Sequence, residues 1–292
     1  LCARLAHVST VVFVHAHPDD EALLTSGTMA RLSAHGHRVV LVMATDGAAG
    51  LVSQEVASDG DVAATRQAEL ATSGRALGVS AFHQLGYSDS GLAGDAVVGP
   101  GQHRFADAEV DHVAAELVSI FEAESADVVV GYDRSGGYGH PDHIQVHHTV
   151  RRAAEIYTFA PLLEATLPRE PMLRVVKLIY AQRWAVPALG GLDIETWRTA
   201  YTPRDKIDYR VDVRPNITQK RASLAAHASQ ATADDGPRTL SALLKLPKPI
   251  FKWVLGREYF HKVLAGDGAQ PGLLGELFGP RYEPRRRKVA RN

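Results

Sequence analysis

The chain has 292 residues, of which 45% are hydrophobic and 22% are charged, and these values exclude disordered, fibrous and collagen-like proteins. Its 32 basic and 33 acidic residues give a formal net charge of −1, so no overall charge would draw it to nucleic acid or to an anionic membrane. The single cysteine, Cys2, excludes an intrachain disulfide and a cysteine-rich metal site, and it fits a reducing cytoplasm.

Short apolar runs rich in β-branched residues alternate with amphipathic segments, which is typical of a mostly parallel sheet covered by helices. Residues 11–15 and 39–45 are predicted to be the first two strands. Between them, residues 20–35 have apolar side chains at helical spacing, and Gly36 follows as a stop signal. These three elements form a βαβ unit.

The later elements continue the alternation. We predict helices over residues 62–77, 107–124, 141–157 and 217–229, and strands over residues 82–85, 127–132, 175–182 and 209–213. We therefore expect a Rossmann-like, three-layer α/β/α fold with a mostly parallel sheet. The pattern predicts one domain over residues 1–292, with a core at about 10–230 and a C-terminal extension, 231–292, packed on the core or near its pocket.

Two Gly-rich segments, residues 47–60 and 86–103, are predicted to be loops at one rim of the sheet, where they could cover a substrate. The basic run at residues 285–288 is interpreted as a solvated tail and not as a nucleic-acid-binding arm. No apolar stretch approaches the roughly 20 residues that cross a bilayer. The first ten residues contain too little charge and apolar length for a secretory signal, so we expect a cytoplasmic protein.

The sequence HAHPDDE at residues 15–21 directly follows the first predicted strand, where a parallel sheet has its active site. A dinucleotide-binding protein would have a Gly-rich phosphate loop here, and this chain has imidazoles and carboxylates. His17 and Asp20 are three residues apart at a strand-to-helix turn that Pro18 stiffens, so their side chains can converge on one metal ion. This segment predicts a metal site and no dinucleotide site.

The sequence GGYGHPDH at residues 136–143 follows the strand predicted at residues 127–132. With Pro141 at the first helical position, His140 lies at the cap and His143 in the first turn, so both can face the rim of the sheet. Two histidines and one aspartate from separate loops suit a catalytic zinc ion with an open position for water. The combination predicts a hydrolase.

A simpler interpretation remains for each segment alone. The acidic run at residues 19–21 could serve only to favour a helix N-terminus, and a single histidine beside acidic residues is usually a surface or capping group. Two His-Pro-Asp clusters at two predicted strand ends favour the metal site over capping. His147 and His148 lie farther along the same helix and are expected to be structural or surface residues.

Together the two segments resemble the signature pair of the LmbE/PIG-L-type zinc N-deacetylases, over about residues 10–230. The resemblance implies a Rossmann-like fold without a dinucleotide. It also implies that His17, Asp20 and His143 bind the metal and that Asp19 is the general base. Asp19 suits this role because it neighbours two ligands and need not bind the metal itself.

The same resemblance implies roles for four further residues. His140 would be a second catalytic residue, a protonated partner that stabilises the oxyanion and delivers a proton to the amine. Tyr138 would help to polarise the carbonyl group. Arg66 and Asp89 would bind sugar hydroxyls. His227 lies in a late segment that resembles the mycothiol-pathway branch of the family, and no role is assigned to it.

The sequence thus predicts a metal-dependent hydrolase that removes an N-acyl group, most simply N-acetyl, from an amino sugar or sugar conjugate. Zn²⁺ is the expected cofactor, and Fe²⁺ could use the same ligands. The expected partner is a small N-acylated sugar or glycoconjugate, and the oligomeric state is left open. The alternatives are an amidase of the same family acting on larger conjugates, a metal-dependent phosphoesterase, which would more often have two metals, and a non-catalytic carbohydrate-binding relative.

Overall fold

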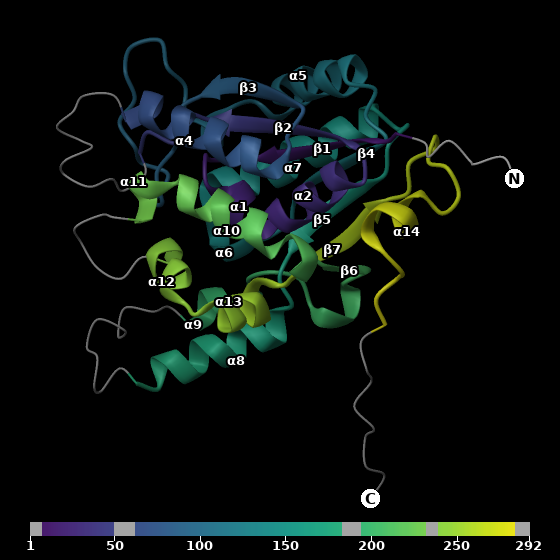
Figure 1. The fold of residues 1–292 in the computed structure, drawn as a ribbon. Helices are drawn as coiled ribbons and strands as arrows, with labels where there is room; N and C mark the ends of the chain where they lie inside the picture. Colours follow the sequence, from purple (N-terminus) through teal and green to yellow (C-terminus); the bar gives the residue numbers. More distant parts are fainter. Residues whose placement is uncertain (1–7, 50–61, 183–193, 232–238, 284–292) are drawn as a thin grey trace, which may run out of the picture.

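The structure is a computed structural model that describes residues 8–49, 62–182, 194–231 and 239–283 (Figure 1). Within these residues, seven strands form a single sheet in the order β3-β2-β1-β4-β5-β7-β6. The strands are β1 (Thr10–His15), β2 (Arg38–Thr45), β3 (Ala81–Tyr87), β4 (Val128–Tyr132), β5 (Leu162–Thr166), β6 (Tyr209–Asp212) and β7 (Arg257–Leu264). The first five strands are mutually parallel, and β7 is antiparallel to both of its neighbours.

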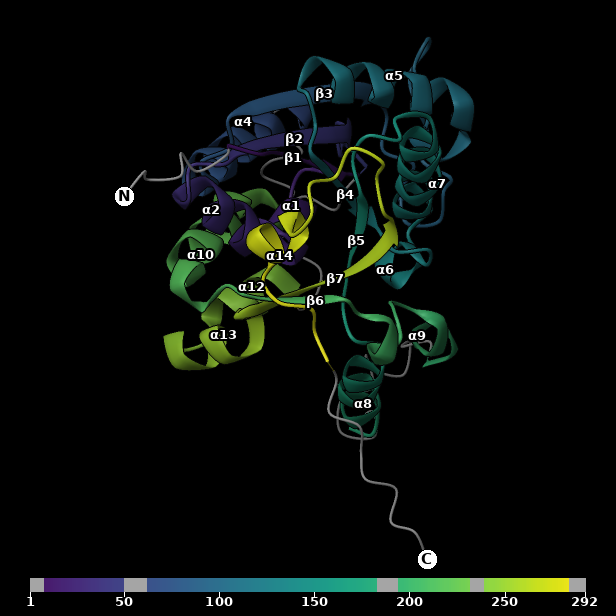
Figure 2. The ribbon, with the colours of Figure 1, turned by 90° about the vertical axis from the view of Figure 1, so that its right-hand side faces the viewer.

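Helices cover both faces of this sheet (Figures 1 and 2). They are α1 (Asp20–Leu24), α2 (Ser26–Ala34), α4 (Val62–Leu77), α5 (Val110–Ala123), α6 (Gly136–Gly139), α7 (Pro141–Ile156), α8 (Arg169–Tyr180), α9 (Ile194–Thr199), α10 (Ile217–Ala226), α11 (Ala228–Ala231), α12 (Thr239–Lys245), α13 (Lys248–Leu255) and α14 (Leu273–Phe278). None of the described helices combines the length and the apolarity needed to cross a bilayer.

Strand β1 lies at the centre of the sheet, and all six of its residues are buried. Because successive side chains of a strand point to opposite faces, Val11 and Phe13 belong to one apolar cluster, and Val12 and Val14 to another. The first cluster also contains side chains of α2, α4 and α14, and the second contains side chains of α5 and α7. The predicted three-layer fold is confirmed.

Strand order reverses at β1, because β2 lies on one side of it and β4 on the other. In an open parallel sheet, this reversal opens a crevice at the carboxyl ends of the two adjacent strands. The two sequence segments that predict a metal site follow β1 and β4, so the topology alone brings them together.

The strand predicted over residues 175–182 is wrong, because this stretch lies in and just after helix α8. Val175, Leu178 and Ile179 are exposed and only Val176 of this helix is buried, so the apolar run is one face of a helix and not a strand of the core. Residues 20–35 form two helices, α1 and α2, which are interrupted at Thr25. The side-chain oxygen of Thr25 lies 2.8 Å from His15 Nε2.

Two strands were not predicted. Strand β5 was not recognised in the sequence, and β7 comes from the C-terminal extension and lies inside the sheet between β5 and β6. The extension therefore forms part of the sheet and does not only pack on it. The basic run at residues 285–288 and most of the loop predicted at 47–60 lie outside the described residues.

Candidate metal centre and active site

The turn after β1 places the side chains of His17 and Asp20 on one side. The Asp20 amide donates to the His17 carbonyl oxygen at 3.2 Å, and Asp20 Oδ2 accepts the His17 backbone N–H at 2.9 Å. The chain folds back on itself at Pro18 and Asp19 and then enters α1. This local geometry is what the three-residue spacing predicted.

The segment after β4 packs tightly on the first turn of α7. Gly136 has φ 57°, and a Cβ built there would lie 2.7 Å from the Ile144 amide nitrogen and 2.8 Å from His143 Cβ. Glycine is therefore needed for both its backbone conformation and its lack of a side chain. The Gly136 carbonyl oxygen, held in this position, accepts from His143 Nδ1 at 3.2 Å.

Asp20 is the point at which the two segments meet. Its Oδ2 lies 3.2 Å from His17 Nδ1 and 3.2 Å from His143 Nε2. His143 Nε2 is buried and makes no hydrogen bond within the described residues, and the other ring nitrogen donates to a carbonyl oxygen. A buried imidazole with a free lone pair beside a carboxylate and a second imidazole is a donor set that fits a divalent transition metal.

The other nitrogen of His17 is held by a buried carboxylate. His17 Nε2 donates to Asp142 Oδ2 at 3.0 Å and lies 3.4 Å from Asp89 Oδ1. A proton fixed on Nε2 leaves Nδ1 as the nitrogen available to a metal. Burial lowers the pKa of His17, but the carboxylates of Asp142, Asp20 and Asp89 outweigh it and raise the pKa well above its usual value. The surroundings thus favour a positive charge, which a bound metal ion would supply.

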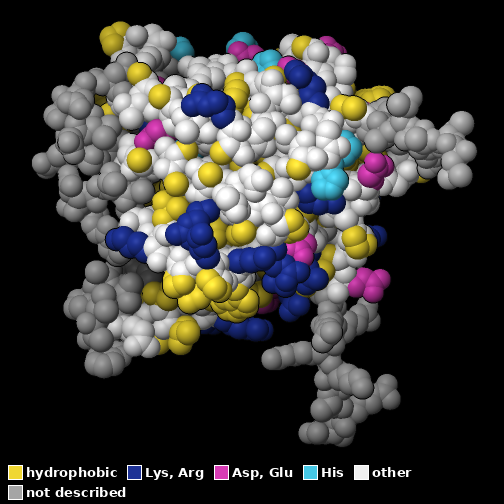
Figure 3. Space-filling view, in the orientation of Figure 1, with side chains coloured by type: hydrophobic (Ala, Val, Ile, Leu, Met, Phe, Trp, Pro, Cys, Tyr) yellow, Lys and Arg dark blue, Asp and Glu magenta, His cyan; other side chains and the backbone are white. Residues whose placement is uncertain are grey.

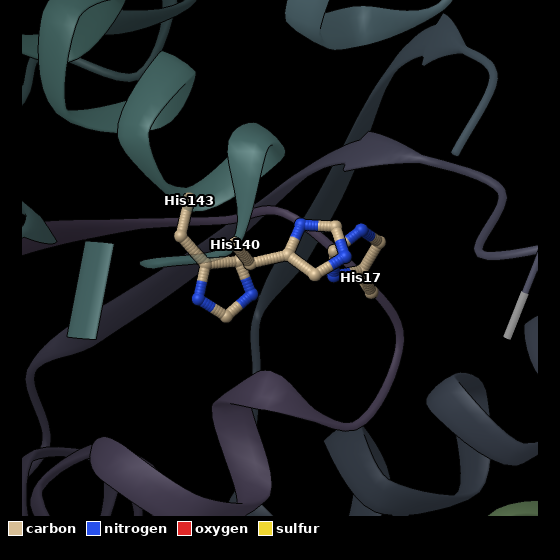
Figure 4. A group of neighbouring side chains, drawn as sticks. All are labelled: His17, His140 and His143. Carbon is tan, nitrogen blue, oxygen red and sulfur yellow. The ribbon is translucent and has the colours of Figure 1, made fainter. Parts of the chain in front are cut away.

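His140 lies in the same cluster and gives a second possible ligand set. The side chains of His17, His140 and His143 lie close together (Figure 4), and one nitrogen of each lies within 4.8 Å of the others. A second group with this spacing consists of His17, Asp89, His140 and Asp142. All three predicted ligands therefore lie close together in the described structure. His140 could take the place of Asp20 as the third metal ligand.

The position of His140 at the N-terminus of α7 favours a role other than ligation. Its Nδ1 accepts the Asp142 backbone N–H at 3.2 Å and so caps the helix. Burial, together with His17 and His143 nearby, lowers the pKa of His140 to about 4. A neutral His140 with Nδ1 as acceptor carries its proton on Nε2. It can donate a hydrogen bond without being the cation that the family resemblance implied.

Asp19 has the most accessible carboxylate of this turn, with 18% of its side chain exposed against 11% for Asp20. Burial raises the pKa of Asp19 to about 6, against the attraction of Arg66. Its backbone has φ 128° and ψ −24°, a region that residues other than glycine rarely adopt. A partly exposed carboxylate with a raised pKa suits a general base.

Tyr138 lies at the opening of the cluster. It is 40% exposed, and its ring centre lies 5.2 Å from that of His143. Burial of part of the ring and the nearby carboxylates of Asp20 and Asp19 raise its pKa, so the hydroxyl stays protonated and can donate a hydrogen bond.

Arg66 and Asp89, the two predicted substrate-binding residues, both reach the site. Arg66 is 2% exposed and donates to the carbonyl oxygens of Gly47 and Pro18 and, at 3.2 Å, to Asp19 Oδ2. These bonds make it a support of the Asp19 turn, which differs from the expected contact with sugar hydroxyls. Asp89 Oδ1 accepts the Gly91 backbone N–H at 2.9 Å and faces His17.

The structure adds Asp142 and Ser90, to which the sequence analysis gave no role. Asp142 is fully buried, and besides His17 it accepts the backbone N–H and the hydroxyl of Ser90, at 2.9 and 2.5 Å. The motif carried only part of this signal: Asp142 lies between His140 and His143 in sequence, but the histidine that its carboxylate orients, His17, belongs to the other segment. His147 is buried against Glu164 and is structural, as expected.

Comparison with known proteins shows which family this chain resembles. The family model described as GlcNAc-PI de-N-acetylase (PIG-L) matches residues 12–154, which contain every residue of the cluster. A 1D-myo-inositol 2-acetamido-2-deoxy-alpha-D-glucopyranoside deacetylase of Thermomonospora curvata is 32% identical over 92% of this chain and 97% of its own length. The protein of the same name from Mycolicibacterium smegmatis is 36% identical, covering 89% of this chain and 91% of its own length.

Among solved structures, the N,N'-diacetylchitobiose deacetylase of Pyrococcus horikoshii aligns with a TM-score of 0.54 at 22% identity, over 91% of this chain and 85% of its own. This similarity concerns the fold. The similarity to the curated relatives extends over nearly the whole length of both chains, and on that basis the chain belongs to the PIG-L family of de-N-acetylases.

Proposed function

We propose that this deacetylase holds a zinc ion with His17, Asp20 and His143 and removes the acetyl group from an N-acetylglucosaminyl inositol. The substrate class comes from the names of the relatives that align over almost their full length. One observation carries the chemistry. Asp20 Oδ2 lies 3.2 Å from a nitrogen of each histidine, immediately beside the accessible carboxylate of Asp19.

Zinc, when bound, polarises an amide carbonyl and lowers the pKa of a coordinated water. Asp19 is the group that takes the proton of the attacking water, because it is the carboxylate with the greatest exposure and the fewest competing donors. Arg66, at 3.2 Å from Asp19 Oδ2, fixes one carboxylate oxygen and leaves the other for this proton.

His140 and Tyr138 stabilise the negative charge that forms on the carbonyl oxygen. The Nε2–H of His140 and the hydroxyl of Tyr138 can donate to the oxygen that becomes negative as water adds to the carbonyl carbon. When the carbon–nitrogen bond breaks, the amine must gain a proton. The proton that Asp19 has taken from the water is the source within the site, because a neutral His140 would become an imidazolate if it gave up its Nε2 proton. The products are acetate and a free amine.

Substrate contacts by Arg66 and Asp89 stay predictions. Asp89 keeps one carboxylate oxygen, Oδ1, on the Gly91 amide and His17, so its other oxygen could accept a sugar hydroxyl. Arg66 is buried with Nη1 and Nη2 bonded to backbone carbonyl groups and to Asp19, and its Nε–H has no hydrogen-bond partner within the described residues. We also propose a cytoplasmic location, on the basis of the single cysteine.

The test is an amine-release assay on a panel of N-acetylglucosaminyl inositol, free N-acetylglucosamine, diacetylchitobiose and bulkier amide conjugates. Metal-depleted protein is compared with protein reconstituted with Zn²⁺ or Fe²⁺. We expect the highest kcat/KM for the inositol conjugate with zinc. Preference for the bulky amides would identify an amidase, and release of phosphate from esters without amine release would contradict the proposal.

A further inference from the structure

Behind the Asp19 turn lies a carboxylate that the chemistry above does not use. Glu21 is fully buried in α1, and its two oxygens accept three hydrogen bonds. Oε2 accepts the Asp19 backbone N–H at 3.0 Å, and Oε1 lies 2.6 Å from Ser73 Oγ and 2.6 Å from His227 Nε2. A buried carboxylate is unfavourable unless it is paired and hydrogen-bonded, and each of these donors contributes to that pairing.

The bond to the Asp19 amide falls on the strained residue of the site. Asp19 has φ 128°, a backbone conformation that is unfavourable for any residue with a side chain. Such a conformation persists only where contacts with the surrounding structure impose it. Here both contacts fall on the peptide group that joins Pro18 to Asp19. Glu21 accepts the N–H of Asp19, and Arg66 donates to the Pro18 carbonyl oxygen at 2.5 Å.

His227 holds Glu21 in place through a hydrogen bond from its Nε2. It follows the last residue of α10, lies 206 positions from Glu21 in the chain and is fully buried. Its Nδ1 makes no hydrogen bond within the described residues, so the bond from Nε2 to Glu21 is the polar contact of this ring. Ser223 Oγ of α10 lies 2.7 Å from Oγ of Ser73 in α4, so the same network links α10 to α4.

A buried ion pair can also act only in packing, and the chain contains such a pair for comparison. Lys220, on the same helix α10, lies 2.6 Å from Glu258, which also accepts the amides of Gly27 and Thr28 at 2.8 and 2.7 Å. Both residues are buried, and no group of the metal cluster is among these partners. The difference between the two pairs is the bond from Glu21 to the Asp19 amide.

We infer that Glu21, held by His227, is a positioning residue that fixes the strained backbone of Asp19 and thereby aims its carboxylate at the metal site. The inference rests on the proposed role of Asp19 as the base. The inference gives a role to His227, which is remote from the metal motifs in sequence, and to Glu21, the third acidic residue of the first motif.

The first experiment compares Glu21→Gln with the matched control Glu258→Gln. Both changes remove the charge of a buried, multiply hydrogen-bonded carboxylate, so both should lower the melting temperature. Only Glu21→Gln should lower kcat, by about 10–100-fold, the range typical of residues that orient a catalytic group. Its KM and zinc content should stay near the wild-type values. A kcat within twofold of wild type, or an equal loss in both variants, would overturn the inference.

The second experiment does not depend on activity. The double variant Glu21→Met/His227→Leu replaces the ion pair by apolar side chains of similar size, which is often tolerated where removal of one partner is not. In a crystal structure of the metal-free variant, Asp19 should leave the positive-φ region and its carboxylate should move away from Asp20. An unchanged φ at Asp19 would overturn the inference, whatever the wild-type protein hydrolyses. Relaxation of Asp19 in a protein whose wild type releases no amine would instead refute the proposed reaction and leave the positioning contact established.

Discussion

Asp142→Asn is the variant that most directly tests how the metal site is built. Asp142 Oδ2 accepts the His17 Nε2–H, and Oδ1 accepts the Ser90 hydroxyl. An asparagine can keep its oxygen toward His17 and turn its amide group toward Ser90, whose hydroxyl can accept as well as donate. The bond to His17 then survives, but it loses the negative charge of its acceptor.

The size of the effect follows from that lost charge. A hydrogen bond to a charged group contributes about 1.5–3 kcal/mol and one between neutral groups about 0.5–1.5 kcal/mol, so the loss is on the order of 1–1.5 kcal/mol. Since about 1.4 kcal/mol corresponds to a tenfold change in an equilibrium constant, zinc should bind about tenfold more weakly. Asp142→Leu, which leaves no acceptor for His17, should weaken zinc binding by about 100-fold.

Competition with a chromogenic chelator measures both zinc affinities. Glu164→Gln is the matched control, because Glu164 is also a buried carboxylate paired with a histidine of α7, His147, at 3.0 Å. Its zinc affinity should equal that of wild type. If Asp142→Asn and Asp142→Leu both bind zinc within twofold of wild type, His17 is not oriented by Asp142 and the assignment of Nδ1 as the metal-binding nitrogen fails.

Three further variants separate the roles within the cluster. Asp19→Asn should lower kcat by roughly 10²–10⁴-fold, the usual contribution of a general base, with zinc still near one equivalent by elemental analysis. His143→Ala should lose zinc and activity together, whereas His140→Ala should keep zinc and lose about 10²–10³-fold in kcat; zinc lost from His140→Ala would instead favour the three-histidine ligand set. Tyr138→Phe should lower kcat about tenfold and leave the melting temperature unchanged, since the ring is 40% exposed, and an unchanged kcat would remove it from the reaction.

The sequence predicted the central part of the fold well, because its buried strands are continuous apolar runs. The strand predicted over residues 175–182 was wrong, because the apolar residues there belong to the exposed face of helix α8. Strand β7, next to the sheet edge, was not predicted, because its sequence REYFHKVL has polar and apolar residues in pairs and lacks the alternation typical of a strand. In each case the environment of the segment decided its structure, and the local pattern did not.

The site was predictable to the extent that it is local in sequence. His17 and Asp20 lie in one turn and His143 in one helix start, so spacing and strand ends were enough to bring them together. Arg66 was expected to face the substrate, and its bonds to two backbone carbonyl groups depend on how α4 packs on the turn. The contact between Glu21 and His227 could not be predicted, because it spans 206 positions.

The three consecutive acidic residues of this turn have different surroundings, and the backbone conformation determines where each carboxylate lies. Asp20 begins α1 and faces the two histidines, while Glu21, one position later, points back into the core toward His227. Asp19, whose φ is positive, has the most exposed carboxylate of the three and pairs with Arg66. A relaxed Asp19 would change the direction of the carboxylate as well as the energy of the turn. The backbone conformation of Asp19 is therefore part of the catalytic arrangement. Glu21 and Arg66, which both bind the peptide group before Asp19, should affect kcat more than zinc binding.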